Sequence, residues 1–222
     1  QYLFFPLNDG KTPLLIWLFV PFQYLFSDPL LAARFVLVLV GLVQVYVMGF
    51  LAKLWGFDKK AQIFTMFLTT LLPFWFFHQR IALMDGLMSL GLSLSLIFAT
   101  QLLYLPAKTW LRAKLFWLNF FALSLSFGLS LWTKLPAILF APVLVVFAWV
   151  FVAKNIKERL IKTSLVGAAV LGGVSLFFLL KLHPAFSQLF SRGGDFLFKP
   201  AEILAGDWRY SFNQIPRYLS EL

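Results

Sequence analysis

The stretch "LFWLNFFALSLSFGLSLWTKLPAILFAPVLVVFAWVFVA", residues 115–153, decides the fold because it is almost entirely apolar. About 20 apolar residues cross a bilayer as a helix, so the stretch is too long for one span. It is interrupted by "WTKLP", Trp132 to Pro136. Proline has no N–H and disfavours helical backbone in the residue before it. The stretch therefore predicts two membrane spans, at about 115–131 and 135–153.

The composition of the whole chain has the same character. Of its 222 residues, 61% are hydrophobic and 13% are charged, and 28 are Phe. A soluble domain is closer to half apolar and a quarter charged, so the composition indicates an integral membrane protein. The chain has no cysteine, which excludes disulfides, thiolate metal sites and cysteine nucleophiles. Its two histidines are too few to form a histidine-based metal site alone.

Four further apolar stretches lead us to expect an all-α polytopic membrane protein with six spans. The last span contains "GAAVLGG", and small residues of this kind suit close packing between helices. The expected organisation is an outer loop with an interfacial helix (1–29), a transmembrane domain (30–182) and an outer loop segment (183–222). The expected spans are about 30–52, 61–77, 86–104, 115–131, 135–153 and 164–180.

The segment Thr12 to Phe26 is apolar but short, and it contains Pro13 and Pro21. Such a segment makes a poor span and fits a helix that lies on the outer leaflet or is half-buried in the protein. Trp17 and Tyr24 suit the level of the lipid headgroups.

Most basic residues lie in alternate loops, after the first, third and fifth spans. Alternate loops share one side of the membrane, and the positive-inside rule makes that side cytoplasmic. The net charge of +10 is therefore explained by topology and does not indicate nucleic-acid binding. The residues in question are Lys53, Lys59, Lys60, Lys108, Arg112, Lys114, Lys154, Lys157, Arg159 and Lys162.

The opposite side carries few charges, and topology gives no reason for basic residues there. We single out Lys11, Arg34, Arg80 and Lys134, together with Asp85 in the turn "HQRIALMD". Structural explanations without a role in catalysis or binding stay open for several of them. Lys11 could snorkel at the interface. Arg80 could complement a helix dipole or pair with Asp85, and Asp85 could cap the next helix.

Three stretches resemble the GT-C glycosyltransferases of the protein O-mannosyltransferase and aminoarabinose (lipid A) transferase group. "GKTPLLIWL…PFQYLFSDPLLAARFVLVLVGL" resembles the family stretch "GKPPLYYWL…lfG…aaRlpSal.G". "RIALMDGLM", Arg80 to Met88, resembles "aRia..D..l", and "GLSLWTKLPAILFAP", Gly128 to Pro142, resembles "Gla.LtKgp…lp". The three landmarks occur in the family order and cover about residues 11–142.

The resemblance implies that a sugar passes from a polyprenyl-phosphate carrier to an acceptor at the outer membrane face. The acceptor would be a glycan, a lipid or a protein, and membrane lipid would surround the enzyme. The resemblance implies lipid-phosphate binding by Lys11, Arg34, Arg80 and Lys134, and it makes Asp85 a catalytic candidate. No metal site is expected from spacing, and the resemblance leaves the metal requirement open.

In this family the best-marked acidic residue precedes the "GKPPL" stretch. We therefore expect the chain to be part of a longer protein that carries the main base upstream. We also expect that protein to lie in a bacterial or archaeal plasma membrane. The alternatives are a non-catalytic membrane protein of envelope-glycan assembly and a transporter. Transporters place charges or broken helices at the bilayer midplane, whereas charges here gather at the ends of spans, which favours interfacial chemistry.

Overall fold

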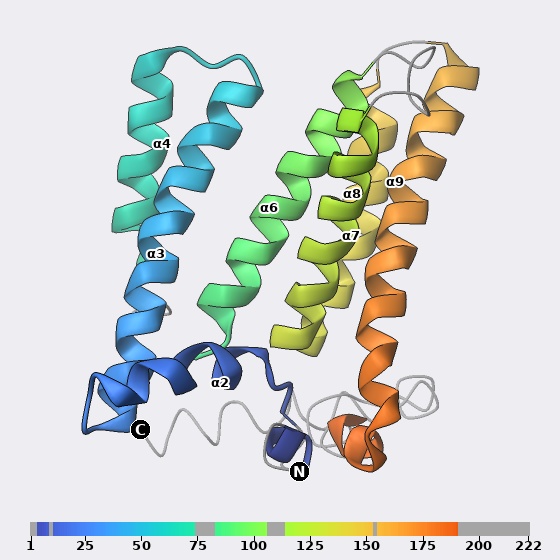
Figure 1. The fold of residues 1–222 in the computed structure, drawn as a ribbon. Coiled ribbons are helices and arrows are strands. Elements are labelled where there is room, and N and C mark those ends of the chain that lie inside the picture. The colour runs from blue at the N-terminus through green and yellow to red at the C-terminus, as the bar shows by residue number, and fades with distance from the viewer. Residues whose placement is uncertain (1–3, 9–10, 74–82, 106–113, 153–154, 191–222) are drawn as a thin grey trace, which may run out of the picture.

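The computed structural model describes residues 4–8, 11–73, 83–105, 114–152 and 155–190, in which every regular element is a helix (Figure 1). This architecture confirms the predicted all-α polytopic fold. The longer helices are α3 (Pro29–Leu54), α4 (Lys59–Leu71), α6 (Asp85–Tyr104), α7 (Lys114–Thr133), α8 (Phe140–Phe151) and α9 (Ile156–Phe177). The shorter helices are α1 (Phe5–Asn8) and α2 (Leu14–Phe19), and the 3-10 helices η2 (Val20–Tyr24), η4 (Leu135–Leu139), η5 (Phe178–Leu182) and η6 (Pro184–Phe190).

Four helices of the described chain are long and apolar enough to cross a bilayer: α3, α6, α7 and the continuous α9–η5 helix. They correspond to four of the six predicted spans. The other two predicted spans, 61–77 and 135–153, contain shorter helices. Helix α4 ends at Leu71, and residues 74–77 lie outside the described part of the chain. Helices η4 and α8 together occupy Leu135–Phe151.

The break in the apolar stretch 115–153 lies where Pro136 predicts it. Helix α7 ends at Thr133, Lys134 has an extended backbone, and η4 begins at Leu135 with Pro136 in its first turn. Polar caps fix other helix starts. Asp58 accepts from the N–H of Ala61 at 2.8 Å before α4, and equivalent caps by Asp28 and Asn155 precede α3 and α9.

The helices pack in the order α4, α3, α6, α7, α9, with α8 against α9 (Figure 1). One buried apolar cluster lies among α6, α7, α8 and α9, and a second lies among α2, α3 and α6. Large apolar side chains cover much of the outside, as a lipid-facing surface requires. Leu42, Phe64, Leu118 and Val150 are each more than half exposed.

Helices α7 and α9 approach closely at a pair of glycines. A Cβ atom added to Gly173 would lie 2.7 Å from the carbonyl oxygen of Ser124 and 3.0 Å from the backbone nitrogen of Gly128. The small-residue segment of the last span therefore makes the close contact that its sequence predicts. Hydrogen bonds reinforce the contact, because the Ser124 hydroxyl donates to the Ala169 carbonyl at 2.8 Å.

One lysine assigned to topology lies inside the protein. Lys162 of α9 is only 6% exposed, and its ammonium donates to the carbonyl of Leu103 and lies 3.2 Å from the Glu158 carboxylate. Leu103 belongs to the last turn of α6, whose carbonyls have no partner within their own helix. Lys162 therefore caps α6 and is more than a surface charge that sets topology.

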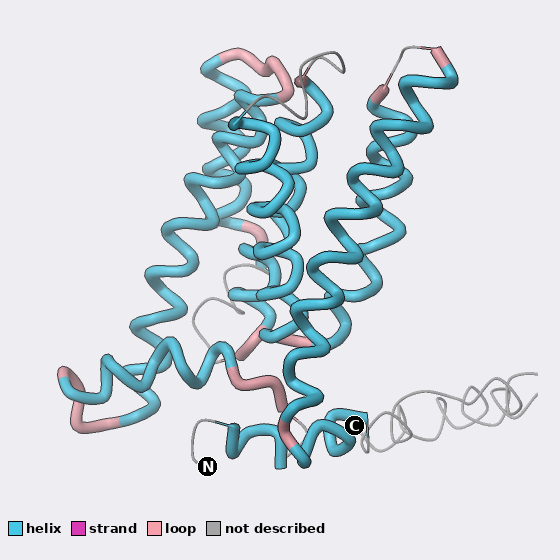
Figure 2. The backbone as a smooth tube through the Cα atoms, turned by 45° about the vertical axis from the view of Figure 1, so that its right-hand side comes forward, coloured by secondary structure: helices cyan, strands magenta, loops and turns pink. Residues whose placement is uncertain are grey.

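The short helices gather at one end of the bundle, where α6 begins and α7 ends (Figures 1 and 2). Helix α2 runs across this end (Figure 1), in the segment predicted to be interfacial. Tyr24 is 92% exposed, as expected of a headgroup-level side chain. Trp17 instead packs into the protein, with its ring edge-on to Phe4 at 5.3 Å and to Trp132 at 5.4 Å between ring centroids.

Candidate functional site

A cavity of about 720 Å³ lies at this end of the bundle, and three charged side chains line it. Lys11 comes from the segment before α2, Asp85 from the start of α6, and Lys134 from the link between α7 and η4. These residues are far apart in the sequence. The rest of the wall is mainly apolar and comes from α2, the start of α3, the residues before α6, η4 and Leu189.

Asp85 and Lys134 form a direct ion pair. The Lys134 ammonium donates to both carboxylate oxygens of Asp85, at 2.8 and 3.0 Å. The Asp85 side chain is 17% exposed and that of Lys134 is 41% exposed, so the pair is partly shielded from solvent. Asp85 is the first residue of α6, and its negative charge is also favourable beside the positive end of that helix.

The start of α6 excludes one of the explanations that the sequence leaves open for Asp85. The N-cap position of α6 belongs to Met84, which makes no side-chain cap, and Asp85 follows it. The hypothesis that Asp85 caps this helix is therefore wrong. A pair between Asp85 and Arg80 lies outside the described residues, because 74–82 are not among them.

The position of Lys134 follows from the backbone around it. Its N–H donates to the carbonyl of Ser130 at 2.9 Å, which completes the last turn of α7. Its extended backbone then leaves the helix, and Pro136 starts a new one. The lysine side chain is thus presented at a break between two helices, beside the cavity.

Lys11 lies immediately before the apolar helix α2. Its backbone N–H donates to the carbonyl of Pro6 at 3.0 Å, which ties the segment to α1. Pro13 precedes the first residue of α2 and is buried. Leu15 and Ile16 of α2 line the same cavity as Lys11. An ammonium group and an apolar wall are therefore adjacent, as a ligand with a charged head and a hydrocarbon tail would need.

Of the two arginines predicted to bind lipid phosphate, the structure describes only Arg34. Arg34 lies on the exposed side of α3, whereas its neighbour Ala33 is buried and lines the cavity. Arg34 is not among the residues that form the cavity wall. Arg80 lies outside the described residues.

Thr12 also belongs to this site, although it is not among the residues predicted from the sequence. Thr12 is 3% exposed, lines the cavity, and donates its hydroxyl to the backbone carbonyl of Thr133. A sign of its role in the sequence was its place in the "GKTPL" stretch. The similar family stretch, "GKPPL", has a proline at the position of Thr12.

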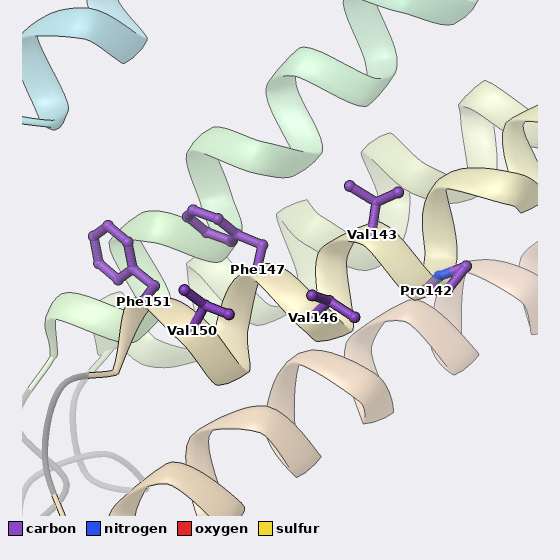
Figure 3. Close-up of a pocket in the computed structure, with 6 residues that line it drawn as sticks. All are labelled: Pro142, Val143, Val146, Phe147, Val150 and Phe151. Atoms are coloured by element: carbon purple, nitrogen blue, oxygen red, sulfur yellow. The ribbon is translucent and has the colours of Figure 1, made fainter.

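Two further hollows are apolar. One, of about 340 Å³, lies between α2, α6 and α7 and includes Leu14, Leu18 and Gly91. The other, of about 540 Å³, follows one face of α8, where Val143, Phe147 and Phe151 project from the helix (Figure 3). No charged side chain lines either hollow, so the charged cavity is the better candidate for chemistry. Among the described residues, no three His, Cys, Asp or Glu side chains come together as a metal site would require.

The site therefore belongs to an all-α membrane protein with a charged cavity at one end of its helix bundle. The family model for dolichyl-phosphate-mannose-protein mannosyltransferases matches residues 8–189. The chain belongs to this family of membrane glycosyltransferases, which confirms the resemblance seen in its sequence. No curated protein and no solved structure matches the chain.

Proposed function

We propose that this protein transfers a sugar from a polyprenyl-phosphate-linked donor to an acceptor at the outer face of a plasma membrane. The observation that carries the proposal is that Lys11 and Lys134 line one cavity, beside the apolar helix α2. A polyprenyl-phosphate sugar has the matching chemistry, because its phosphate is anionic and its tail is hydrocarbon. Family membership supports the glycosyltransferase class.

In the proposed reaction, a hydroxyl oxygen of the acceptor forms a bond to the anomeric carbon of the sugar. The bond between that carbon and the phosphate oxygen breaks, and its electron pair leaves with the phosphate. The acceptor's hydroxyl proton passes to a carboxylate base. The leaving polyprenyl phosphate gains one negative charge, so cations near the phosphate stabilise the transition state more than the ground state.

The three charged residues have different roles in this proposal. Lys11 and Lys134 bind the phosphate as compact point charges. Asp85 holds Lys134 in place, with both carboxylate oxygens bonded to its ammonium. Because those oxygens already accept from a cation, we assign the role of base to a carboxylate other than Asp85. Arg34, exposed on α3, would contact the headgroups of surrounding lipids.

The sidedness of the site rests on charge. Lys53, Lys60 and Lys157 lie at the end of the bundle opposite the cavity, close to the ends of α3, α4 and α9. The positive-inside rule then makes the cavity end the outer one. The charged residues of the cavity lie at the end of the bundle and not at mid-span, which favours interfacial chemistry over a transport path.

The test is a transfer assay in membranes with a labelled polyprenyl-phosphate sugar and the full-length protein. We expect transfer by the wild type and its loss in the double variant Lys11→Gln/Lys134→Gln. Lys181→Gln is the matched control, because Lys181 is an exposed lysine of η5 that does not line the cavity. Transfer by the double variant at the wild-type rate would contradict the proposed site. Absence of transfer by the wild type with every polyprenyl-phosphate sugar offered would contradict the function.

A further inference from the structure

The side chain of Thr12 is buried among the three segments that carry the charged residues of the cavity. Its hydroxyl donates to the carbonyl of Thr133, and it lies 3.9 Å from the sulfur of Met84. Each of these partners is the immediate neighbour of a charged residue, as Thr12 itself is of Lys11. One side chain therefore connects the three segments that carry Lys11, Asp85 and Lys134.

The carbonyl of Thr133 needs such a donor. It lies at the end of α7, where the last carbonyls have no partner in their own helix. The residue three positions on is Pro136, which has no N–H. The next residue, Ala137, donates its N–H to the carbonyl of Lys134, at 3.1 Å. The helix break that presents Lys134 thus leaves a buried acceptor, and the Thr12 hydroxyl satisfies it.

We propose that Thr12 is a positioning residue that sets the spacing of Lys11 and Lys134 across the cavity. This inference rests on the proposed function of the two lysines. Thr12 touches no phosphate itself and acts through the backbone of its neighbours. Without its hydrogen bond, the segment before α2 is no longer tied to the end of α7, and the backbone positions from which the two lysine side chains project no longer have a fixed separation.

A hydroxyl is the feature that matters at this position, since valine has the same shape and lacks the donor. Thr12→Val leaves the Thr133 carbonyl buried without a partner, whereas Thr12→Ser keeps the donor and loses only a methyl group. The matched control is Thr70→Val. Thr70 is an exposed residue of α4 whose hydroxyl bonds within its own helix, to the carbonyl of Met66 at 3.0 Å.

The experiment measures two quantities in the full-length protein, in membranes or nanodiscs. One is the rate of sugar transfer, and the other is the affinity for sugar-free polyprenyl phosphate. We expect Thr12→Val to lower each by about tenfold, Thr12→Ser to remain within about threefold of the wild type, and Thr70→Val to match the wild type.

A double-mutant cycle separates positioning from a general loss of structure. In the Lys11→Gln/Lys134→Gln background, we expect Thr12→Val to change the residual affinity by less than about twofold, because no lysine spacing remains to be set. Equal losses in both backgrounds would mean that Thr12 only supports folding, and would overturn the inference. Wild-type affinity and transfer in Thr12→Val would overturn it while leaving the proposed function intact. A wild type that neither transfers sugar nor binds polyprenyl phosphate would overturn both.

Discussion

Asp85 and Lys134 join the first residue of α6 to the residue that follows α7, with both carboxylate oxygens within 3.0 Å of one ammonium. Helices α6 and α7 also pack along their lengths, so the ion pair ties together two helices that are already neighbours. It is therefore placed to orient Lys134 at the wall of the cavity, in addition to any contribution to stability.

Breaking this ion pair is expected to destabilise the protein moderately. The pair is neither fully exposed nor fully buried, so Lys134→Gln or Asp85→Asn should each lower the free energy of unfolding by about 1–2 kcal/mol. Thermal unfolding in detergent measures the change. The exchange variant Asp85→Lys/Lys134→Asp should recover only part of the stability, because the lysine then lies at the positive end of α6 and the aspartate at the negative end of α7. It should not transfer, because the ammonium then projects from α6. Full transfer by the exchange variant would show that the position of the ammonium does not matter.

Lys11 should tolerate arginine poorly if it binds phosphate. We expect Lys11→Gln to lose about 2–4 kcal/mol of transition-state stabilisation, or roughly 30- to 1000-fold in rate. Lys11→Arg should restore only part of the rate, because the planar guanidinium has a longer reach than a compact ammonium. The measurement is transfer from a polyprenyl-phosphate sugar by variants matched for expression. A lysine that only snorkels would give a nearly silent Gln variant and a fully active Arg variant.

The orientation can be tested with single cysteines, because the chain has none of its own. Cysteine at position 60 or 157 should resist a membrane-impermeant maleimide in intact cells, since both positions lie at the predicted cytoplasmic end. Cysteine at position 23 or 27, next to α3 at the cavity end, should be labelled. All four positions are exposed, so accessibility within the protein does not confuse the result. The reverse pattern would invert the proposed sidedness.

The contact between α7 and α9 predicts that substitution by alanine changes the stability very differently at two glycines of α9. Gly173→Ala should destabilise the protein by about 1–3 kcal/mol, because the added methyl group meets the backbone of α7. Gly167→Ala is the control, since no atom outside the adjacent backbone of its own helix lies within 4 Å of its added Cβ. It should be neutral or stabilising by up to about 1 kcal/mol, because alanine favours helix. Equal effects in thermal unfolding would contradict the close approach of the two helices.

The sequence is sufficient to predict the all-α membrane fold and four helices long enough to cross a bilayer. It also predicts that Lys11, Asp85 and Lys134 lie at one end of the bundle, where they line a cavity. Apolar runs predict six spans, four of which correspond to membrane-length helices, and Pro136 predicts the break after α7. The alternation of basic loops placed Lys11, Asp85 and Lys134 at a common end. These features depend on local composition and on chain direction, which a single sequence contains.

Contacts between distant residues could not be predicted in the same way. Nothing in the local pattern shows that Asp85 pairs with Lys134, 49 residues away, and does not cap α6. The burial of Lys162 under the end of α6 was missed because a lysine in a basic loop has the composition of a topology signal. The hydroxyl of Thr12 was missed because its partner is the backbone carbonyl of a residue 121 positions away, which a local sequence pattern does not identify.

The hydrogen bond from Thr12 to Thr133 spans 121 residues, and this separation has a consequence for biogenesis. At about 5–20 residues per second, a ribosome synthesises Thr133 roughly 6–24 s after Thr12. During that interval the Thr12 hydroxyl has no Thr133 carbonyl to bond, although α3 and α6 have already been synthesised. The cavity is consequently a late product of membrane insertion. Mutations that delay the insertion of α7 should impair it even when they lie far from its wall.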